Sequence, residues 1–137
     1  MVGKLLYIDS SAFLRRILRH EGSALVDAAL VRHSTAPGGR VVSSRLLALE
    51  SRGVAVRVKQ NGNDISATVA ANLDTIDILP LTEDVWTRAS AIEQHIKTLD
   101  ALHLATCLIV GADLLTLDKN MALVAPSLGV SLALPSD

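Results

Sequence analysis

The sequence predicts an α/β protein of three layers, with a central and mostly parallel sheet between two layers of helices. Short apolar runs, too brief for helices, alternate along the chain with longer stretches of helical composition. This alternation is typical of parallel sheets that helices cover on both faces. The length of 137 residues, of which 50% are hydrophobic, suits one domain with a sizeable core. We therefore expect residues 1–137 to form a single domain.

The expected strands are short, apolar and bounded by turn or capping residues. The first covers residues 5–8 and stops at Asp9, where Ser10 and Ser11 can begin a helix. Turn residues bound the later apolar runs in the same way. These further strands are expected at residues 40–43, 76–81, 114–117 and 130–134.

Helices are expected in the intervals, several of which open on serine, threonine or aspartate. The stretch 44–60 is ambiguous, because Val54, Val56 and Val58 alternate as in a strand while the leucines near its start favour a helix. We interpret this stretch as a helix. The full set of expected helices is 12–19, 23–32, 44–60, 64–73, 82–96, 100–110 and 119–124.

Composition excludes several classes of protein. One cysteine rules out an intramolecular disulfide framework and suits a reducing cytoplasm, which is the location we expect. The longest uncharged hydrophobic stretch, residues 101–112, is well short of the roughly 18 residues that a membrane span requires. Aromatic residues make up only 2% of the chain, so we do not expect single strands of nucleic acid to be held by base stacking.

The net charge of −1 hides a strong polarity along the chain. Residues 1–60 carry ten basic and four acidic side chains, a balance of +6, whereas residues 61–137 carry three basic and ten acidic ones, a balance of −7. Such an asymmetry marks a surface for a polyanion beside an acidic region, or it reflects ordinary solvated helix faces. Both interpretations stay open at this point.

Four acidic residues fall where they can meet. Asp9 directly follows the first strand and Asp118 directly follows the strand at 114–117. Because the carboxyl ends of parallel strands meet at one edge of a sheet, these two carboxylates are expected to lie together. Asp100 stands at the start of a helix, and Glu50 lies among leucines, where burial of a carboxylate is costly unless it is paired, protonated or bound to metal.

Each of these acids also has an ordinary explanation as a helix cap, a turn residue or an exposed side chain. Together they point to chemistry, because converging carboxylates repel one another unless a cation neutralises them. Hard oxygen ligands select Mg²⁺ or Mn²⁺ over Zn²⁺. Two such ions about 4 Å apart can activate water and stabilise the leaving oxygen of a phosphodiester.

A zinc site is the competing metal hypothesis. His103 and Cys107 are spaced four residues apart and share a helix face with Asp100. The chain has no second Cys or His pair at ligand spacing, which argues against zinc. Cys107 itself is flanked by apolar residues and is interpreted as part of the core.

Four segments, in order along nearly the whole chain, resemble the motifs of the PIN-domain ribonucleases, and within them the VapC-type toxins of bacterial toxin–antitoxin pairs. Each segment carries one of the four acids. Thr116, two residues before the fourth acid, and Ser10, beside the first, also match family positions. The segments are YIDSSA at 7–12, VSS at 42–44 followed by Glu50, LDALHLAT at 99–106 and GADLLTLD at 111–118.

This resemblance implies a PIN-like fold and a metal-dependent endoribonuclease that hydrolyses RNA at a four-carboxylate site holding Mg²⁺ or Mn²⁺. It also implies a homodimer and a cognate antitoxin protein that binds across the site. On this basis Asp9, Asp100 and Asp118 are the expected metal ligands. Glu50 is expected to complete the catalytic cluster as a ligand or by holding a metal-bound water.

Further side chains are expected around this cluster. Ser10 and Thr116 would orient the carboxylates. The basic first half of the chain would hold the phosphates of the RNA while the acids hold the ions. The candidates for phosphate contacts are Arg15, Arg16, Arg45 and Lys119.

Two alternatives belong to other functional classes. A receiver-like signalling domain would bind Mg²⁺ through Asp9 and a second strand-end acid, but it needs an acidic pair after the first strand, where this chain has Ser10 and Ser11. A catalytically idle PIN-like module that only binds proteins is the other alternative. The complete set of four acids argues against it, and an activity assay separates the two classes.

Overall fold

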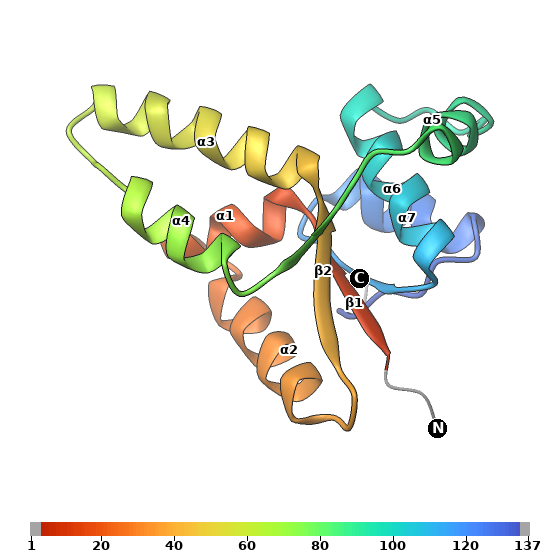
Figure 1. The fold of residues 1–137 in the computed structure, drawn as a ribbon, viewed down its shortest axis with the longest axis horizontal. Coiled ribbons are helices and arrows are strands. Elements are labelled where there is room, and N and C mark those ends of the chain that lie inside the picture. Colours follow the sequence, from red (N-terminus) through yellow and green to blue (C-terminus); the bar gives the residue numbers. More distant parts are fainter. Residues whose placement is uncertain (1–3, 135–137) are drawn as a thin grey trace.

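A parallel sheet of four strands forms the centre of the computed structural model, which describes residues 4–134 (Figure 1). Its strands run in the order β3-β2-β1-β4, and all three pairings are parallel. Helices pack on both sides of the sheet, so the predicted three-layer α/β fold is confirmed. The strands are β1 (Leu5–Ile8), β2 (Arg40–Ser44), β3 (Asp77–Leu79) and β4 (Asp113–Leu115).

The helices divide into two layers with separate apolar cores. The first layer joins side chains of its four helices to one face of β1 and β4, and the second joins its helices to the opposite face. The first layer holds α1 (Ser10–Leu18), α2 (Ser23–Thr35), α3 (Arg45–Gln60) and α4 (Ser66–Leu73). The second holds α5 (Glu83–Ser90), α6 (Thr98–Val110) and α7 (Lys119–Ser127).

Strand β1 is buried on both faces, as its apolar composition predicts. Leu6 and Ile8 pack into the first layer, whereas Tyr7 packs between the sheet and the second layer. Successive side chains of a strand point to opposite faces, which explains this division. Tyr7 pairs with Val42 of β2 on one side and with Leu114 of β4 on the other. The central position of β1 places whatever follows Ile8 at the middle of one sheet edge.

The order of the strands creates a switch point beside β1. The chain adds β2 and then β3 on one side of β1, and it returns to add β4 on the other side. In open parallel sheets, ligands bind at the carboxyl ends of the strands where the order reverses. The order also differs from the 2-1-3-4-5 arrangement of receiver domains, which removes the receiver-like alternative.

The ambiguous stretch at 44–60 is a helix. Ser44 caps α3 by accepting a hydrogen bond from the backbone N–H of Leu46 at 3.3 Å. Leu47, Ser51 and Ala55 are buried at four-residue spacing, the spacing of one helix face. In a strand the three alternating valines would share one buried face. In the helix they do not, because Val56 is 61% exposed to solvent, away from the buried face of α3.

Several expected elements are shorter than predicted. The strand expected at 76–81, for example, covers only Asp77–Leu79. The helix expected at 82–96 ends at Ser90, and residues 91–97 continue without regular structure, with Ile92 and Ile96 packed against the second layer. No glycine or proline marks this break in the sequence. The strand expected at 130–134 is a single parallel bridge between Leu132 and Leu114. The Leu114 N–H donates to the Ser131 carbonyl and the Leu114 carbonyl accepts from the Ala133 N–H, both at 2.8 Å. Across residues 4–134, none of the helices has the length and apolar character needed to span a bilayer.

Candidate active site at the carboxyl edge of the sheet

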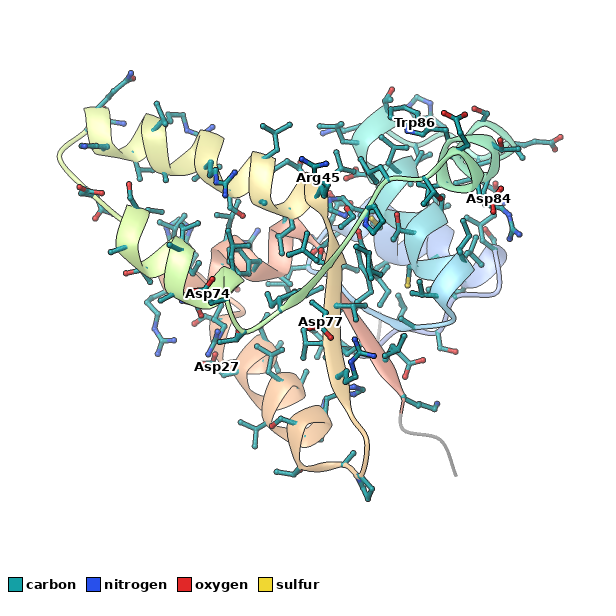
Figure 2. All side chains as sticks on the ribbon, in the orientation of Figure 1. Asp27, Arg45, Asp74, Asp77, Asp84 and Trp86 are labelled. Carbon is teal, nitrogen blue, oxygen red and sulfur yellow. The ribbon has the colours of Figure 1, made fainter. Side chains whose placement is uncertain are left out.

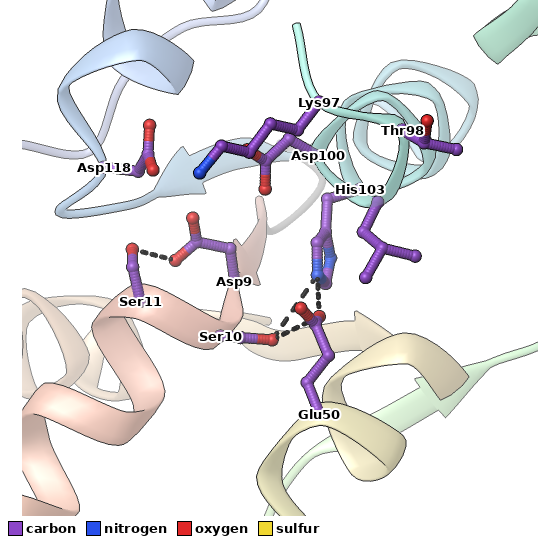
Figure 3. A pocket seen from close by; sticks show the side chains of 10 residues that line it. Asp9, Ser10, Ser11, Glu50, Lys97, Thr98, Asp100, His103 and Asp118 are labelled. Carbon is purple, nitrogen blue, oxygen red and sulfur yellow. Dashed lines mark hydrogen bonds and ion pairs between the residues drawn. The ribbon is translucent and has the colours of Figure 1, made fainter. Parts of the chain in front are cut away.

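All four predicted acids line one cavity of about 350 Å³ at the carboxyl edge of the sheet (Figure 3). The cavity lies at the switch point, because Asp9 follows β1 and Asp118 follows the neighbouring β4. Glu50 enters from α3 and Asp100 from the first turn of α6. The lining residues are Asp9, Ser10, Ser11, Glu50, Lys97, Thr98, Leu99, Asp100, His103 and Asp118.

Asp9 is the most buried of the four acids, with 1% of its surface exposed. It caps α1, and its Oδ1 accepts hydrogen bonds from the Ala12 backbone N–H at 3.0 Å and the Ser11 hydroxyl at 2.7 Å. The Thr116 hydroxyl donates to Oδ2. Loss of hydration raises the pKa of Asp9 above the usual range of an aspartate, although these hydrogen bonds oppose the shift.

Ser11 and Thr116 join the start of α1 to the end of β4. Their hydroxyl oxygens lie 3.2 Å apart, and each also accepts a backbone N–H, from Leu117 and Asp118 respectively, at 3.0 Å. Thr116 therefore hydrogen-bonds the Asp9 carboxylate, which is the contact that its expected orienting role requires. Ser11 does so as well, a role that sequence reasoning missed because a serine at this position is fully explained as a helix cap.

Asp118 and Asp100 face the cavity from the second layer. Asp118 caps α7, with Oδ1 accepting the Met121 backbone N–H at 2.8 Å. Within residues 4–134 the carboxylate of Asp100 has no hydrogen-bond partner. Desolvation, and then the negative charge of Asp118, raise the pKa of Asp100, with further contributions from Asp9 and Glu50. The negative charges of these carboxylates therefore repel one another, and a bound cation or a proton would reduce that repulsion.

Glu50 has a different environment from the three aspartates. Its Oε1 accepts the Ser10 hydroxyl at 2.7 Å and a hydrogen bond from His103 Nε2 at 2.8 Å. Although desolvation works in the opposite direction, these hydrogen bonds and the electrostatic attraction of His103 lower the pKa of Glu50 below its usual range. Ser10 therefore hydrogen-bonds the Glu50 carboxylate on α3, which is the contact that its expected orienting role requires.

The donor set fits a hard divalent cation, since four carboxylates line one cavity and no thiolate does. Among residues 4–134, however, no three His, Cys, Asp or Glu side chains stand close enough together to enclose an ion as they are. Carboxylates that face one cavity repel one another. Small rotations of side chains toward a shared cation would relieve that repulsion.

The structure does not support the zinc hypothesis. Cys107 is fully buried in the second-layer core, where its thiol donates to the Ala112 carbonyl at 3.3 Å and burial raises its pKa to about 12. Both ring nitrogens of His103 already have partners, in Tyr7 and Glu50. A thiol that is protonated and turned into the core is neither a metal ligand nor a nucleophile.

The predicted phosphate-binding residues fall into two groups. Arg45 is exposed and begins α3 at the carboxyl edge of the sheet (Figure 2). Lys119 is also exposed and begins α7 at the same edge. Arg15 and Arg16 lie in the last turn of α1, at the far end of that helix from Asp9. Arg16 is held by Asp27 and Asn72, both at 2.7 Å, and Arg15 donates to the Glu21 carbonyl at 3.0 Å.

Lys97 is a basic residue of the cavity that sequence reasoning missed. It precedes α6, and its side chain extends between Asp118 and Asp100 (Figure 3). Its only sequence signal is its position three residues before Asp100. Such spacing is too common to be diagnostic by itself.

Comparison with known proteins agrees with this geometry. The sequence model of the PIN domain family matches residues 6–126. A chain of a toxin–antitoxin complex from Klebsiella pneumoniae is similar in fold, with a TM-score of 0.65 and 21% identity over 94% of this chain and 98% of that chain. A chain of VapBC2 from Rickettsia felis, in a structure bound to a DNA fragment from their promoter, has a TM-score of 0.67. Its identity is 12% over 93% of this chain and 96% of that chain. No curated protein sequence matches the chain.

Proposed function

This chain belongs to the PIN domain family, whose sequence model spans residues 6–126, and from that premise we propose that it is a divalent-metal-dependent endoribonuclease. We further propose that it acts as the toxin of a toxin–antitoxin pair. One observation carries the first proposal. The four acids, one from each segment that resembles a family motif, line the same cavity at the switch point of the sheet.

Asp9, Asp100 and Asp118 would hold Mg²⁺ or Mn²⁺, and Glu50 would act beside them. A divalent ion in such a site lowers the pKa of bound water and stabilises the leaving oxygen of a phosphodiester. Hydrogen bonds from neighbouring hydroxyl groups hold two of these carboxylates in place. Ser11 and Thr116 fix Asp9, and Ser10 fixes Glu50.

Basic side chains around the cavity support a polyanionic substrate. Lys97 lines the cavity, and the exposed side chains of Arg45 and Lys119 lie at the same edge of the sheet. Positive charge beside a metal-binding cluster lets the backbone of RNA approach carboxylates that would otherwise repel it. These three residues are the phosphate contacts that we propose.

Exposed apolar side chains on α3 and α5 support a protein partner. Leu49 and Val56 on α3 are 69% and 61% exposed. Trp86 on α5 is 46% exposed (Figure 2). Both fold relatives are described as toxin–antitoxin complexes. We propose that this surface serves an antitoxin or a second copy of the chain, and sedimentation with and without a co-expressed partner distinguishes the two.

Expression of the chain alone is expected to arrest growth of a bacterial host, because uncontrolled RNA cleavage stops protein synthesis. Asp100→Asn should relieve the arrest, since it removes one of the proposed ligands. Colony counts after induction, with protein levels matched by immunoblot, measure the effect. Normal growth with abundant soluble and RNA-cleaving wild-type protein would contradict the toxin role while leaving the nuclease in place.

The affinity for RNA is expected to fall steeply with salt, with a slope of log affinity against log salt of roughly −0.7 for each phosphate contacted. In an inactive Asp9→Asn background, Arg45→Ala with Lys119→Ala should flatten this slope by about 1.4. Fluorescence anisotropy over a salt series measures it.

The matched control is Lys4→Ala with Arg32→Ala, which makes the same change of charge at the opposite edge of the sheet and should keep the slope. Arg15→Ala with Arg16→Ala tests the other predicted pair, and we expect a smaller change because Arg16 is already paired with Asp27. Equal flattening by all three double variants would mean that binding is diffuse and that no edge of the sheet is preferred.

A further inference from the structure

A chain of three hydrogen bonds runs from the core of the second layer to Glu50, and the proposed chemistry does not use its inner members. The Tyr7 hydroxyl lies 2.6 Å from Nδ1 of His103, and Nε2 of the same ring lies 2.8 Å from Oε1 of Glu50. The Ser10 hydroxyl donates to that oxygen at 2.7 Å. Tyr7 and His103 are 0% and 1% exposed, and of the two only His103 lines the cavity.

The direction of these bonds follows from the chemistry of their ends. Ionised Glu50 can only accept hydrogen bonds, so Nε2 of His103 carries a proton and donates it. In the neutral imidazole Nδ1 is then an acceptor, and the Tyr7 hydroxyl is the donor that faces it. A tyrosine hydroxyl is protonated at neutral pH, so it has a hydrogen to donate. With a neutral imidazole the order of donation is therefore Tyr7 to His103 to Glu50.

This arrangement leaves Glu50 with one free oxygen. Two donors occupy Oε1, whereas Oε2 accepts no hydrogen bond from any residue in the range 4–134. Ser10 belongs to α1, Glu50 to α3 and His103 to α6, so the contact fixes the carboxylate relative to three elements at once. Without it, a long flexible side chain at a helix surface would turn away from the negative charge of the aspartates.

Building on the proposed nuclease function, we propose that Tyr7 and His103 are positioning residues that hold Glu50 in one rotamer and present its Oε2 to the reaction. Tyr7 sets the tautomer of His103, and His103 holds the carboxylate. The pair belongs to the core of the protein and acts only through Glu50, because buried partners of this kind orient the groups that touch metal or water.

We call the chain of hydrogen bonds from Tyr7 through His103 to Glu50 the relay. Two measurements test it in the full chain. Tyr7→Phe removes one oxygen from the core and keeps the ring. In steady-state cleavage of a quenched fluorescent RNA with Mg²⁺, it should lower kcat by about tenfold and change KM by less than about twofold. In ¹⁵N spectra of the histidine side chains, His103 should be the Nε2–H tautomer in the wild type and a mixture of tautomers in Tyr7→Phe.

His103 itself gives a conservative rescue. His103→Gln keeps an N–H donor near Glu50 and should retain more of kcat than His103→Leu, which fills the space without a donor. The matched control is Thr106→Val, which removes another buried hydroxyl from α6, one that bonds only the Leu102 carbonyl. It should leave kcat and the His103 spectrum unchanged.

Wild-type kcat in Tyr7→Phe, or an Nδ1–H tautomer in the wild type, would overturn the relay. Equal losses in Tyr7→Phe and Thr106→Val would overturn it too, because the effect would then be one of general stability. If the wild-type protein cleaves no RNA, the nuclease proposal fails by itself. The tautomer of His103 in the wild type and in Tyr7→Phe then decides whether the relay exists.

Discussion

Asp9→Asn is expected to lower RNA cleavage with Mg²⁺ by on the order of a thousandfold or more. The substitution keeps the shape of the side chain but removes the charge of the most buried carboxylate in the cavity. Loss of one ligand weakens the hold on a divalent ion and misplaces the attacking water, and about 4 kcal/mol of lost transition-state stabilisation corresponds to a factor of about a thousand. Initial rates on a mixed RNA pool measure the loss.

The variant should nevertheless fold. The Asn oxygen can still accept from the Ala12 N–H and the Ser11 hydroxyl, and the Thr116 hydroxyl can reverse its role and accept. Because burial raises the pKa of Asp9 in the folded state, ionisation of Asp9 opposes folding at neutral pH, and this penalty disappears as pH falls through that raised pKa toward the ordinary value. Asp9→Asn should therefore unfold at higher denaturant concentration than the metal-free wild type at neutral pH, with the difference closing in acid.

Asp113→Asn is the matched control for this experiment. Asp113 begins β4 at the opposite edge of the sheet, where Lys4 lies 3.8 Å away, so its loss should leave cleavage unchanged. Cleavage by Asp9→Asn at the wild-type rate would show that the cavity is not the catalytic site. Equal losses in the two variants would point to a general effect of acidic charge.

Mg²⁺ or Mn²⁺ is expected to raise the thermal midpoint of the metal-free protein. An ion that binds only the folded state stabilises it by about 2.7 kcal/mol at a concentration one hundred times its dissociation constant. For a chain of this length that corresponds to a shift on the order of 5–10 °C. The stabilisation has a clear origin here, because the cation would offset the desolvation and the like-charge repulsion that together raise the pKa of Asp100.

Asp118→Asn should reduce this shift to a small fraction of the wild-type value, because it removes a proposed ligand while the amide oxygen can still cap α7. Asp113→Asn again serves as the control and should keep the full shift. Differential scanning calorimetry with and without the ion measures both. A shift produced by zinc alone, and abolished by His103→Ala, would show that the metal belongs to another class.

The position of the acids was predictable from the sequence, because strand direction alone brings Asp9 and Asp118 to one edge. The helix at 45–60 was predictable only in part, since alternating valines mimic a strand and the decisive fact is which side chains are buried. The early end of α5 had no local signal. It depends on how residues 91–97 pack against the second layer.

The role of His103 could not be predicted from spacing. A single histidine in an apolar helix is ordinarily a core residue, and its two partners lie 96 and 53 residues away in the sequence. Ser11 and Lys97 were hidden for a similar reason, because a cap and an exposed lysine need no further explanation. Sequence patterns predict the periodicity of helices and strands and the direction of the strands. Contacts between side chains from distant elements follow only from the completed packing.

The central position of β1 has a consequence for the newly made chain. Its two neighbours in the sheet come from very different distances, β2 soon after it and β4 almost at the end, and Asp9 and Thr116 are 107 residues apart. Pairings between such distant segments form late, because closing a long loop costs entropy before any contact forms. As the ribosome releases the chain from its first residue onward, Asp9 and Glu50 emerge long before the strand that completes their cavity. A partial polypeptide that ends before β4 therefore carries Asp9 and Glu50 but no assembled cavity, and the cavity forms only after β4 has been made.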